Sequence, residues 1–376
     1  MRYRRFGKTN LNLSVFSLGT MRCVTSAEVA GETIRRAVAL GVNHLETARG
    51  YGNSERYLGK ALQGGVGVAR SQIYITTKIP PTPDADVMKQ QLEASLEHLQ
   101  LDYVDCLAIH GINTWEHLAW LESPQGFMPA VQQAISAGKI RHLGFSTHGP
   151  LELIQRAIAT ELFEFVNLHY TYFFQRNRPA IDLAHQKDMG VFIISPADKG
   201  GMLYTPPPNL VDLCKPFSPL VLNSRFLLDD RRITTLSVGP ANPQELDWPL
   251  EAVDQDPSLT DLEKRILEQL QTYQAKVLGV DHCRQCYACL PCPEEIHIPE
   301  VLRLRNLAVA YGMTEFGQYR YRMFENAGHW FPGSKGNRCT DCGDCLPRCP
   351  EQLDIPVLLR DTHRRLNGPE RRRLWD

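Results

Sequence analysis

The sequence predicts an α/β protein in which a (β/α)8 TIM barrel is followed by a smaller, mainly α-helical, cysteine-rich module. Two observations lead to this prediction. Short apolar runs alternate with amphipathic stretches over residues 1–250, an order typical of right-handed βαβ units around a parallel sheet. Beyond them, most of the eleven cysteines fall in two closely spaced groups. A chain of 376 residues can hold one barrel and one further module.

The number of apolar runs distinguishes between two parallel folds. Eight βα units can close on themselves as a barrel. An open dinucleotide-binding sheet would carry a G-x-G-x-x-G fingerprint in its first βα turn, and this chain lacks it there. Amphipathic stretches that predict helices include residues 29–40, 54–62, 84–99 and 129–137. The eight runs are Val15–Leu18, Asn43–Glu46, Ile73–Thr77, Val104–Ile109, His142–Ser146, Phe165–Leu168, Val191–Ile194 and Thr235–Val238.

Three segments outside the repeating units have predictions of their own. Residues 3–13 predict a small hairpin that plugs the barrel floor, and residues 259–278 predict a connecting helix. The proline- and glycine-rich stretch 199–219 predicts a long loop over the barrel mouth. The expected domains are therefore the barrel over residues 1–255, a helical connection over 256–280 and the cysteine module over 281–376.

The cysteine groups have the spacing of iron–sulfur ligands. The second group reads CTDCGDCLPRCP and matches the C-x2-C-x2-C-x3-C-P run of bacterial ferredoxins, while the first, CRQCYACLPCP, is one residue shorter before its last cysteine. In two-cluster ferredoxins the cysteine before proline ligates the other cluster. We therefore predict two [4Fe–4S] clusters with crossed ligands. One would be bound by Cys283, Cys286, Cys289 and Cys349, and the other by Cys339, Cys342, Cys345 and Cys292.

Two structural zinc sites are the alternative for these cysteines. Zinc sites typically use pairs of C-x2-C held apart by a longer spacer, so triplets followed by C-P favour iron–sulfur binding. Cys23, Cys106 and Cys214 lie outside both groups, and we expect them to be plain core or loop thiols.

The two cysteine groups also belong to an internal repeat. The segments CLPCPEEIHIPEVLRLR and CLPRCPEQLDIPVLLRD align after one gap, so that Ile298-Pro299 matches Ile355-Pro356. A proline in the first turn of a helix sacrifices no hydrogen bond, and each pair is therefore predicted to begin a helix. The module resembles an α-helical ferredoxin type.

Four potential catalytic side chains lie at or near predicted strand ends. They are Glu46, Tyr51 shortly after it, Lys78 and His110. Barrel enzymes hold their sites at the C-terminal ends of the strands. A lone lysine or histidine at such a position is more often satisfied by its neighbours, and a fold by itself does not establish activity.

These residues, together with several short segments, resemble the aldo-keto reductase superfamily, in particular its branch with a fused C-terminal 4Fe-4S ferredoxin-like domain. The resemblance covers roughly residues 1–255. Its segments are the GTM turn at 19–21, TARGYGNSE with GKAL after it, GKIRHLGFS, SP-x-x-KGG and VGPANPQEL.

The resemblance implies an NAD(P)-linked oxidoreductase of small carbonyl or alcohol substrates. Tyr51 would protonate a carbonyl oxygen as hydride arrives from the nicotinamide, and Lys78 would lower the pKa of Tyr51. Glu46 would orient Lys78, and His110 would hold the carbonyl by a hydrogen bond. The residues implied to bind the cofactor are Thr20, Met21, Ser146, Asn167, Ser195, Lys199, Gly239 and Asn242.

The chain departs from the common pattern of that superfamily at three places. Glu46 stands where aspartate is usual, and Ile194 stands where many members stack an aromatic ring on the nicotinamide. The segment VGPANP lacks the arginine that usually grips a 2′-phosphate. The choice between NADP and NAD therefore stays open.

Two functions from different classes fit these observations. In the first, carbonyl reduction or alcohol oxidation is coupled to a protein electron donor or acceptor through the clusters. Because a hydride carries two electrons and a cluster one, a flavin commonly mediates, and we find no flavin signature in the sequence. In the second, a non-catalytic barrel serves as an electron-relay or docking protein on a redox complex. Iron or oxygen sensing is a weaker third interpretation.

Composition argues against some other classes of partner. The formal charge of −1 gives no reason to expect nucleic acid. No apolar run approaches the roughly 18 residues that span a bilayer, and the N-terminal MRYRRF lacks the apolar stretch of a signal peptide. We therefore expect a cytoplasmic location, where thiols stay reduced.

Overall fold

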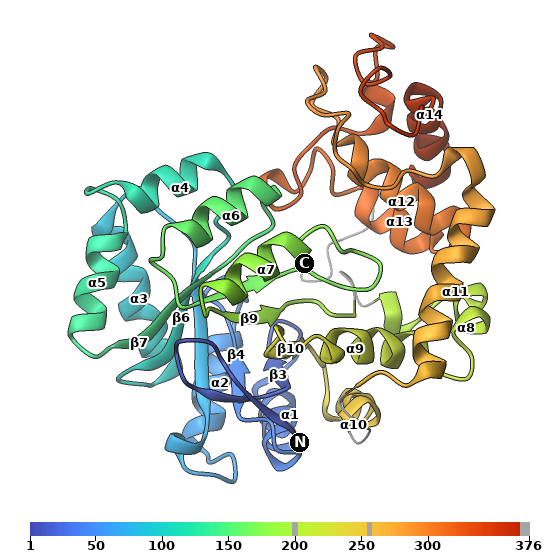
Figure 1. Ribbon diagram of the computed structural model, residues 1–376. Coiled ribbons are helices and arrows are strands. Elements are labelled where there is room, and N and C mark those ends of the chain that lie inside the picture. Colours follow the sequence, from blue (N-terminus) through green and yellow to red (C-terminus); the bar gives the residue numbers. More distant parts are fainter. Residues whose placement is uncertain (198–201, 254–257, 369–376) are drawn as a thin grey trace. The chain divides into compact units, whose positions relative to one another are not determined.

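The computed structural model describes residues 1–197, 202–253 and 258–368 (Figure 1). They group into two compact units. The first comprises residues 1–196 and 224–258, and the second comprises residues 197–223 and the chain from 259 onward. Residues 197–223 lie within the range expected for the barrel but group with the second unit.

The first unit is the predicted (β/α)8 barrel. Eight parallel strands close in the order β10-β3-β4-β5-β6-β7-β8-β9. All eight predicted strands are confirmed, with ends that differ by at most two residues. The strands are β3 (Phe16–Gly19), β4 (His44–Glu46), β5 (Tyr74–Ile79), β6 (Val104–His110), β7 (Ile140–Ser146), β8 (Phe165–Leu168), β9 (Gly190–Ile193) and β10 (Thr235–Val238).

Helices follow most of these strands and lie outside them (Figure 1). Polar residues cap several of their first turns; the side chain of Asp84, for example, accepts hydrogen bonds from two backbone N–H groups of α3. The helices predicted in this part of the chain are confirmed. The helices are α1 (Ala27–Ala39), α2 (Ser54–Gln63), α3 (Ala85–Leu99), α4 (Trp115–Glu122), α5 (Met128–Ser136), α6 (Leu151–Ala159), α7 (Arg178–Gln186), α9 (Pro219–Asp229) and α10 (Trp248–Val253).

The N-terminal hairpin closes the barrel floor, as predicted. Strands β1 (Tyr3–Arg5) and β2 (Asn12–Ser14) pair antiparallel. Phe6 and Leu13 from this hairpin are completely buried in one cluster with side chains of the barrel strands. Phe165, the first residue of β8, lies in that cluster, with 5.1 Å between its ring centroid and that of Phe6. The hairpin therefore excludes water from the N-terminal end of the barrel.

The second unit is mainly helical. The connecting helix α11 (Asp261–Leu278) begins with a capping box between Thr260 and Glu263. Both Ile-Pro pairs of the internal repeat begin helices, as predicted. The other helices are α8 (Pro208–Cys214), α12 (Ile298–Tyr311), α13 (Thr314–Tyr321) and α14 (Ile355–Leu366), and the short 3-10 turns of the whole described chain are η1 (Arg70–Gln72), η2 (Met202–Tyr204), η3 (Pro243–Leu246), η4 (Gly279–Asp281), η5 (Gly328–Trp330) and η6 (Gly336–Arg338).

The segment predicted as a long loop contains helix α8 instead. A proline occupies the first turn of this helix, where the ring favours a helical start rather than a loop. Asn209 on α8 donates a hydrogen bond of 3.0 Å to the carbonyl of Ala310 on α12. None of the described helices is both long and apolar enough to cross a membrane.

The three cysteines outside the two groups are core thiols, as predicted. Cys23, Cys106 and Cys214 are all buried. Burial raises the pKa of the Cys23 and Cys214 thiols to about 12 and raises that of Cys106 further. These thiols therefore stay protonated and unreactive near neutral pH.

Candidate active site and cluster sites

A buried ion pair joins the ends of strands β4 and β5. Lys78 Nζ lies 2.5 Å from Glu46 Oε1, and the two side chains are 2% and 4% exposed. Burial lowers the pKa of Lys78, but the Glu46 carboxylate and Tyr51 raise it by more, so the net pKa lies above its ordinary value. Lys78 is therefore a cation at neutral pH. The carboxylate of Glu46 reaches it even though glutamate is one methylene longer than the usual aspartate.

Tyr51 and His110 lie beside this pair. Lys78 Nζ is 4.9 Å from the centroid of the Tyr51 ring. The rings of Tyr51 and His110 meet edge to face, with 5.7 Å between their centroids. Glu46 and His110 are the last residues of β4 and β6, and Lys78 is the last but one of β5. The structure thus brings all four sequence-predicted catalytic residues together at the C-terminal ends of the strands.

The pKa of Tyr51 differs in direction from the sequence-based expectation. Burial raises it, and this effect outweighs the lowering by the Lys78 ammonium because Glu46 also raises it. The phenol therefore keeps its proton at neutral pH. A protonated phenol beside an ammonium can donate its proton to an oxygen on which negative charge develops.

Asn167 on β8 reaches the same ion pair. Its Nδ2 donates a hydrogen bond of 3.1 Å to Glu46 Oε1, the oxygen that also contacts Lys78. Asn167 is completely buried, and its Oδ1 is without a hydrogen-bond partner in the part of the chain that the structure describes. A buried carbonyl oxygen without a partner is costly, so a ligand with an N–H donor would be favoured here.

The other residues expected to bind the cofactor also end or follow barrel strands. Thr20 Oγ1 donates to the Glu46 carbonyl at 3.0 Å, and Ser146 Oγ accepts from the backbone of Gly111 at 3.1 Å. Met21 and Ser195 are half-buried, and Ser195 has a left-handed φ of 51°.

The loop after β10 is held by an arginine that sequence reasoning missed. Arg22 donates to the carbonyl of Gly239 at 3.0 Å and to Glu245 at 2.7 Å. Asn242 caps the turn η3 through its side-chain oxygen. The last expected cofactor residue, Lys199, lies outside the described residues.

A buried polar layer below the mouth was also missed. His44 is completely buried, and its two ring nitrogens lie 2.6 Å from Ser17 Oγ and 2.7 Å from Thr76 Oγ1. Burial, helped by the charge of Lys78, lowers the pKa of His44 to about 3. His44 is therefore neutral, and its place in an apolar-looking strand gave no signal of this role.

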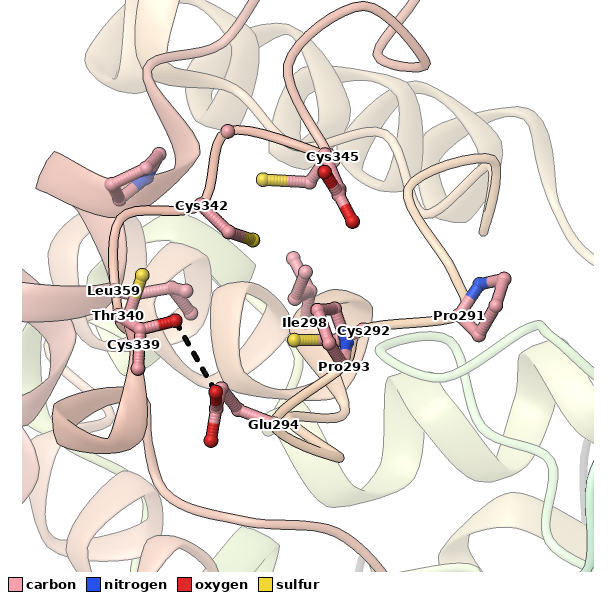
Figure 2. Close-up of a pocket in the computed structure, with 13 residues that line it drawn as sticks. Pro291, Cys292, Pro293, Glu294, Ile298, Cys339, Thr340, Cys342, Cys345 and Leu359 are labelled. Carbon is pink, nitrogen blue, oxygen red and sulfur yellow. Dashed lines mark hydrogen bonds between the residues drawn. The ribbon is translucent and has the colours of Figure 1, made fainter.

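Cys292 of the first cysteine group lies with three cysteines of the second. Cys292, Cys339, Cys342 and Cys345 line one pocket of about 340 Å³, part of it open to solvent. Figure 2 shows the four thiols around a common space, which Ile298 also lines. The structure thus brings together one of the two crossed sets predicted from the sequence.

The remaining four cysteines form a second neighbourhood. Burial raises the pKa of Cys283, and the nearby Cys286 and Cys349 raise it further. Burial raises the pKa of Cys289 to about 12, with smaller contributions from Cys283, Cys286 and, from the other set, Cys345. Among the described residues, no group of three or more His, Cys, Asp or Glu side chains forms a closed site for a single metal ion.

Comparison with known proteins gives two matches along the chain. Residues 16–209 match the aldo/keto reductase family. The chain belongs to this family. Residues 282–353 of this aldo/keto reductase-family protein match the 4Fe-4S dicluster domain, so the C-terminal module carries a 4Fe-4S domain.

Curated relatives of this family member include two named enzymes. It is 33% identical over 150 residues to the methylglyoxal reductase DkgB of Salmonella typhi, which covers 40% of this chain and 53% of the reductase. It is 30% identical over 222 residues to the L-galactose dehydrogenase of Arabidopsis thaliana, covering 54% of this chain and 68% of the dehydrogenase. The chain thus spans about half the length of the methylglyoxal reductase.

Solved structures share the barrel fold. The holo form of the aldo-keto reductase AKR11C1 from Bacillus halodurans aligns with a TM-score of 0.62 and 21% identity, over 72% of this chain and 96% of that protein. The thermostable aldo-keto reductase Tm1743 aligns with a TM-score of 0.60 and 20% identity, over 71% of this chain and 99% of that protein.

Proposed function

We propose that this protein is an NAD(P)H-dependent oxidoreductase of small carbonyl or alcohol substrates whose C-terminal module, residues 281–376, transfers electrons through two [4Fe–4S] clusters. One observation carries the proposal for the barrel. The protonated Tyr51 lies beside a buried Lys78–Glu46 pair and the ring of His110. Such an arrangement fits proton donation to a carbonyl oxygen within a site of low polarity.

The side chains divide this task among them. His110 holds the carbonyl oxygen of the substrate, and Tyr51 delivers its proton as charge develops on that oxygen. Lys78 stabilises the phenolate that remains, since a cation close by favours the charged form. Glu46 holds Lys78 in place, and Asn167 holds Glu46.

A nicotinamide bound here would supply the hydride that, together with the proton of Tyr51, converts C=O into CH–OH. The unpartnered Oδ1 of Asn167 suits the amide N–H of a carboxamide. The cofactor site would be completed by Thr20, Met21, Ser146, Ser195, Lys199, Gly239 and Asn242. NADP and NAD both remain compatible with it, because the loop after β10 has no arginine of its own.

The cluster module serves one-electron transfer in this proposal. A hydride delivers two electrons and each cluster accepts one, so coupling to the barrel requires a mediator such as a flavin on a partner protein. That partner would be an electron donor or acceptor, and the reduced thiols of the cluster ligands favour a cytoplasmic location.

Reduction of the clusters by NADPH or NADH distinguishes the two candidate functions. If barrel and module are coupled, NADPH or NADH should bleach the visible absorbance of the oxidised clusters. The reductant is added to anaerobically purified protein together with a cell fraction that contains the electron partner. Dithionite serves as the positive control. A barrel that neither binds nicotinamide nor reduces carbonyls, in protein whose clusters are reduced by dithionite, would support the relay or docking function instead.

Crossed ligation is the second prediction for the module. Cys286→Ser and Cys349→Ser should impair the same cluster, and Cys342→Ser and Cys292→Ser should impair the other, because each pair belongs to one set. The measurement is the electron paramagnetic resonance (EPR) spectrum of dithionite-reduced protein, which should lose one signal for the first pair and the other signal for the second. Cys292→Ser affecting the signal lost in Cys286→Ser would contradict crossing, and zinc without acid-labile sulfide in the parent would contradict the clusters.

A further inference from the structure

The internal repeat gives the two cysteine motifs nearly the same backbone. The residue before the second cysteine has a left-handed φ in both motifs, 61° at Gln285 and 58° at Asp341. The residue after that cysteine is also left-handed in both, 64° at Tyr287 and 83° at Gly343. Around the second cysteine the two motifs therefore differ mainly in their side chains.

Gln285 gives the first motif a hydrogen-bond donor to a ligand sulfur. Its Nε2 lies 3.5 Å from Cys283 Sγ and also donates to the carbonyl of Pro299 at 2.7 Å. The bond to Pro299 fixes the side chain in this position. The backbone N–H of Gln285 is hydrogen-bonded to the same sulfur.

Asp341 occupies the corresponding place in the second motif and has no donor to offer. Its backbone N–H is hydrogen-bonded to Cys339 as that of Gln285 is to Cys283, but its side chain ends in a carboxylate. Asp341 Oδ1 lies 3.8 Å from Cys339 Sγ, which as a protonated thiol donates to it. A thiolate bound to iron has no proton to donate, and the same carboxylate would then repel it.

The wider surroundings of the second set are acidic as well. Arg360 pairs with Asp341 through a contact of 2.5 Å and offsets part of its charge. Two further acidic residues, Glu294 and Asp344, line the same pocket.

Burial acts in the opposite direction. Cys283 and Cys289 are buried in the first set and Cys345 in the second, and low polarity disfavours the more negative, reduced cluster. Each set nevertheless has one exposed cysteine, Cys286 or Cys342, so both clusters would lie close to solvent. The contacts at 3.5 and 3.8 Å act on the ligand sulfurs directly.

We propose that Gln285 and Asp341 set the order of the two reduction potentials, with the cluster of Cys283, Cys286, Cys289 and Cys349 the higher. Adding one electron makes a cluster more negative, so an N–H donor to its sulfur stabilises the reduced state and a carboxylate destabilises it. A single electron in the module then resides on this cluster: it is reduced by one electron as the other is oxidised by one, without proton transfer. The inference rests on the two crossed clusters of the proposed function.

The test is a redox titration of the full-length, anaerobically purified holoprotein, followed by EPR and poised with dithionite. The parent should show two one-electron steps. Gln285→Met should shift only the higher step to more negative potential, and Asp341→Asn should shift only the lower step to more positive potential. Gln271→Met, which changes an exposed glutamine of α11, is the matched control and should shift neither.

The outcomes separate this inference from the proposal on which it rests. Iron and sulfide contents too low for two clusters in the parent would contradict the two-cluster proposal itself. Two clusters whose lower step responds to Gln285→Met, or whose steps respond to neither substitution, would overturn only the ranking. Should Gln285→Met fail to retain its cluster, Asp341→Asn and the length-preserving Gln285→Glu, which should also lower the higher step, still decide the question.

Discussion

Replacing Tyr51 by phenylalanine is expected to reduce carbonyl turnover by about 10²–10⁴-fold while leaving nicotinamide binding nearly intact. The hydroxyl is needed only as charge develops on the substrate oxygen, and the ring that packs against His110 is retained. Steady-state kinetics with a small aldehyde and fluorescence titration of NADPH measure the two quantities. Because the pKa of Tyr51 is raised above its ordinary 10.0, the parent should not lose activity through its titration below about pH 9.

A second tyrosine supplies the control for this experiment. Tyr57 lies on helix α2 and is not one of the four site residues, and Tyr57→Phe likewise removes one phenolic oxygen. It should leave turnover unchanged. Turnover of Tyr51→Phe equal to that of Tyr57→Phe would overturn the mechanism.

Replacing Lys78 by methionine is expected to destabilise the barrel by about 3–5 kcal/mol, because Glu46 would remain as a buried charge without its partner. Urea unfolding followed by circular dichroism measures the effect. Since the pKa of Lys78 is raised above 10.5, the contribution of the pair is fully present below that value and is lost only as the pH rises through the folded-state pKa. The difference from the parent should therefore be constant between about pH 7 and pH 9.

An exposed ion pair provides the matched control. Lys60 Nζ lies 3.6 Å from Glu28 Oε1, and both side chains are mostly exposed. Lys60→Met should change the free energy of unfolding by no more than about 0.5 kcal/mol. The double substitution of Lys78→Met with Glu46→Gln should recover much of the lost stability, because no buried charge remains. A cost for Lys78→Met as small as that for Lys60→Met would show that the pair does not stabilise the fold.

The sequence predicted the barrel because each strand is a short apolar run and each helix has an apolar face. The same logic failed at α8, where prolines suggested a loop but one of them begins a helix. The meeting of Glu46, Tyr51, Lys78 and His110 followed from their positions near strand ends, since these ends share one edge of a barrel.

Other features depend on the balance of effects in three dimensions. The pKa of Tyr51 is raised because burial and the Glu46 carboxylate together outweigh the Lys78 ammonium. No spacing in the sequence reports that balance. The contact of Gln285 with Cys283 depends on a left-handed turn that a glutamine seldom adopts. The neutral state of His44 and its two hydrogen-bond partners could not be predicted from the sequence, because one histidine in a strand has many possible partners.

The grouping of Cys292 with Cys339, Cys342 and Cys345 has a consequence for how the protein matures in the cell. A nascent chain that has emerged only as far as the first motif holds no complete set of four thiolates, since Cys349 is synthesised 57 positions after Cys292. With crossed ligands, iron–sulfur insertion would therefore wait for the end of translation, and both clusters would be delivered to a module whose two halves have already met. Truncation before Cys349 would then remove more than the C-terminal segment, because the cluster of the first motif would also lose its fourth ligand.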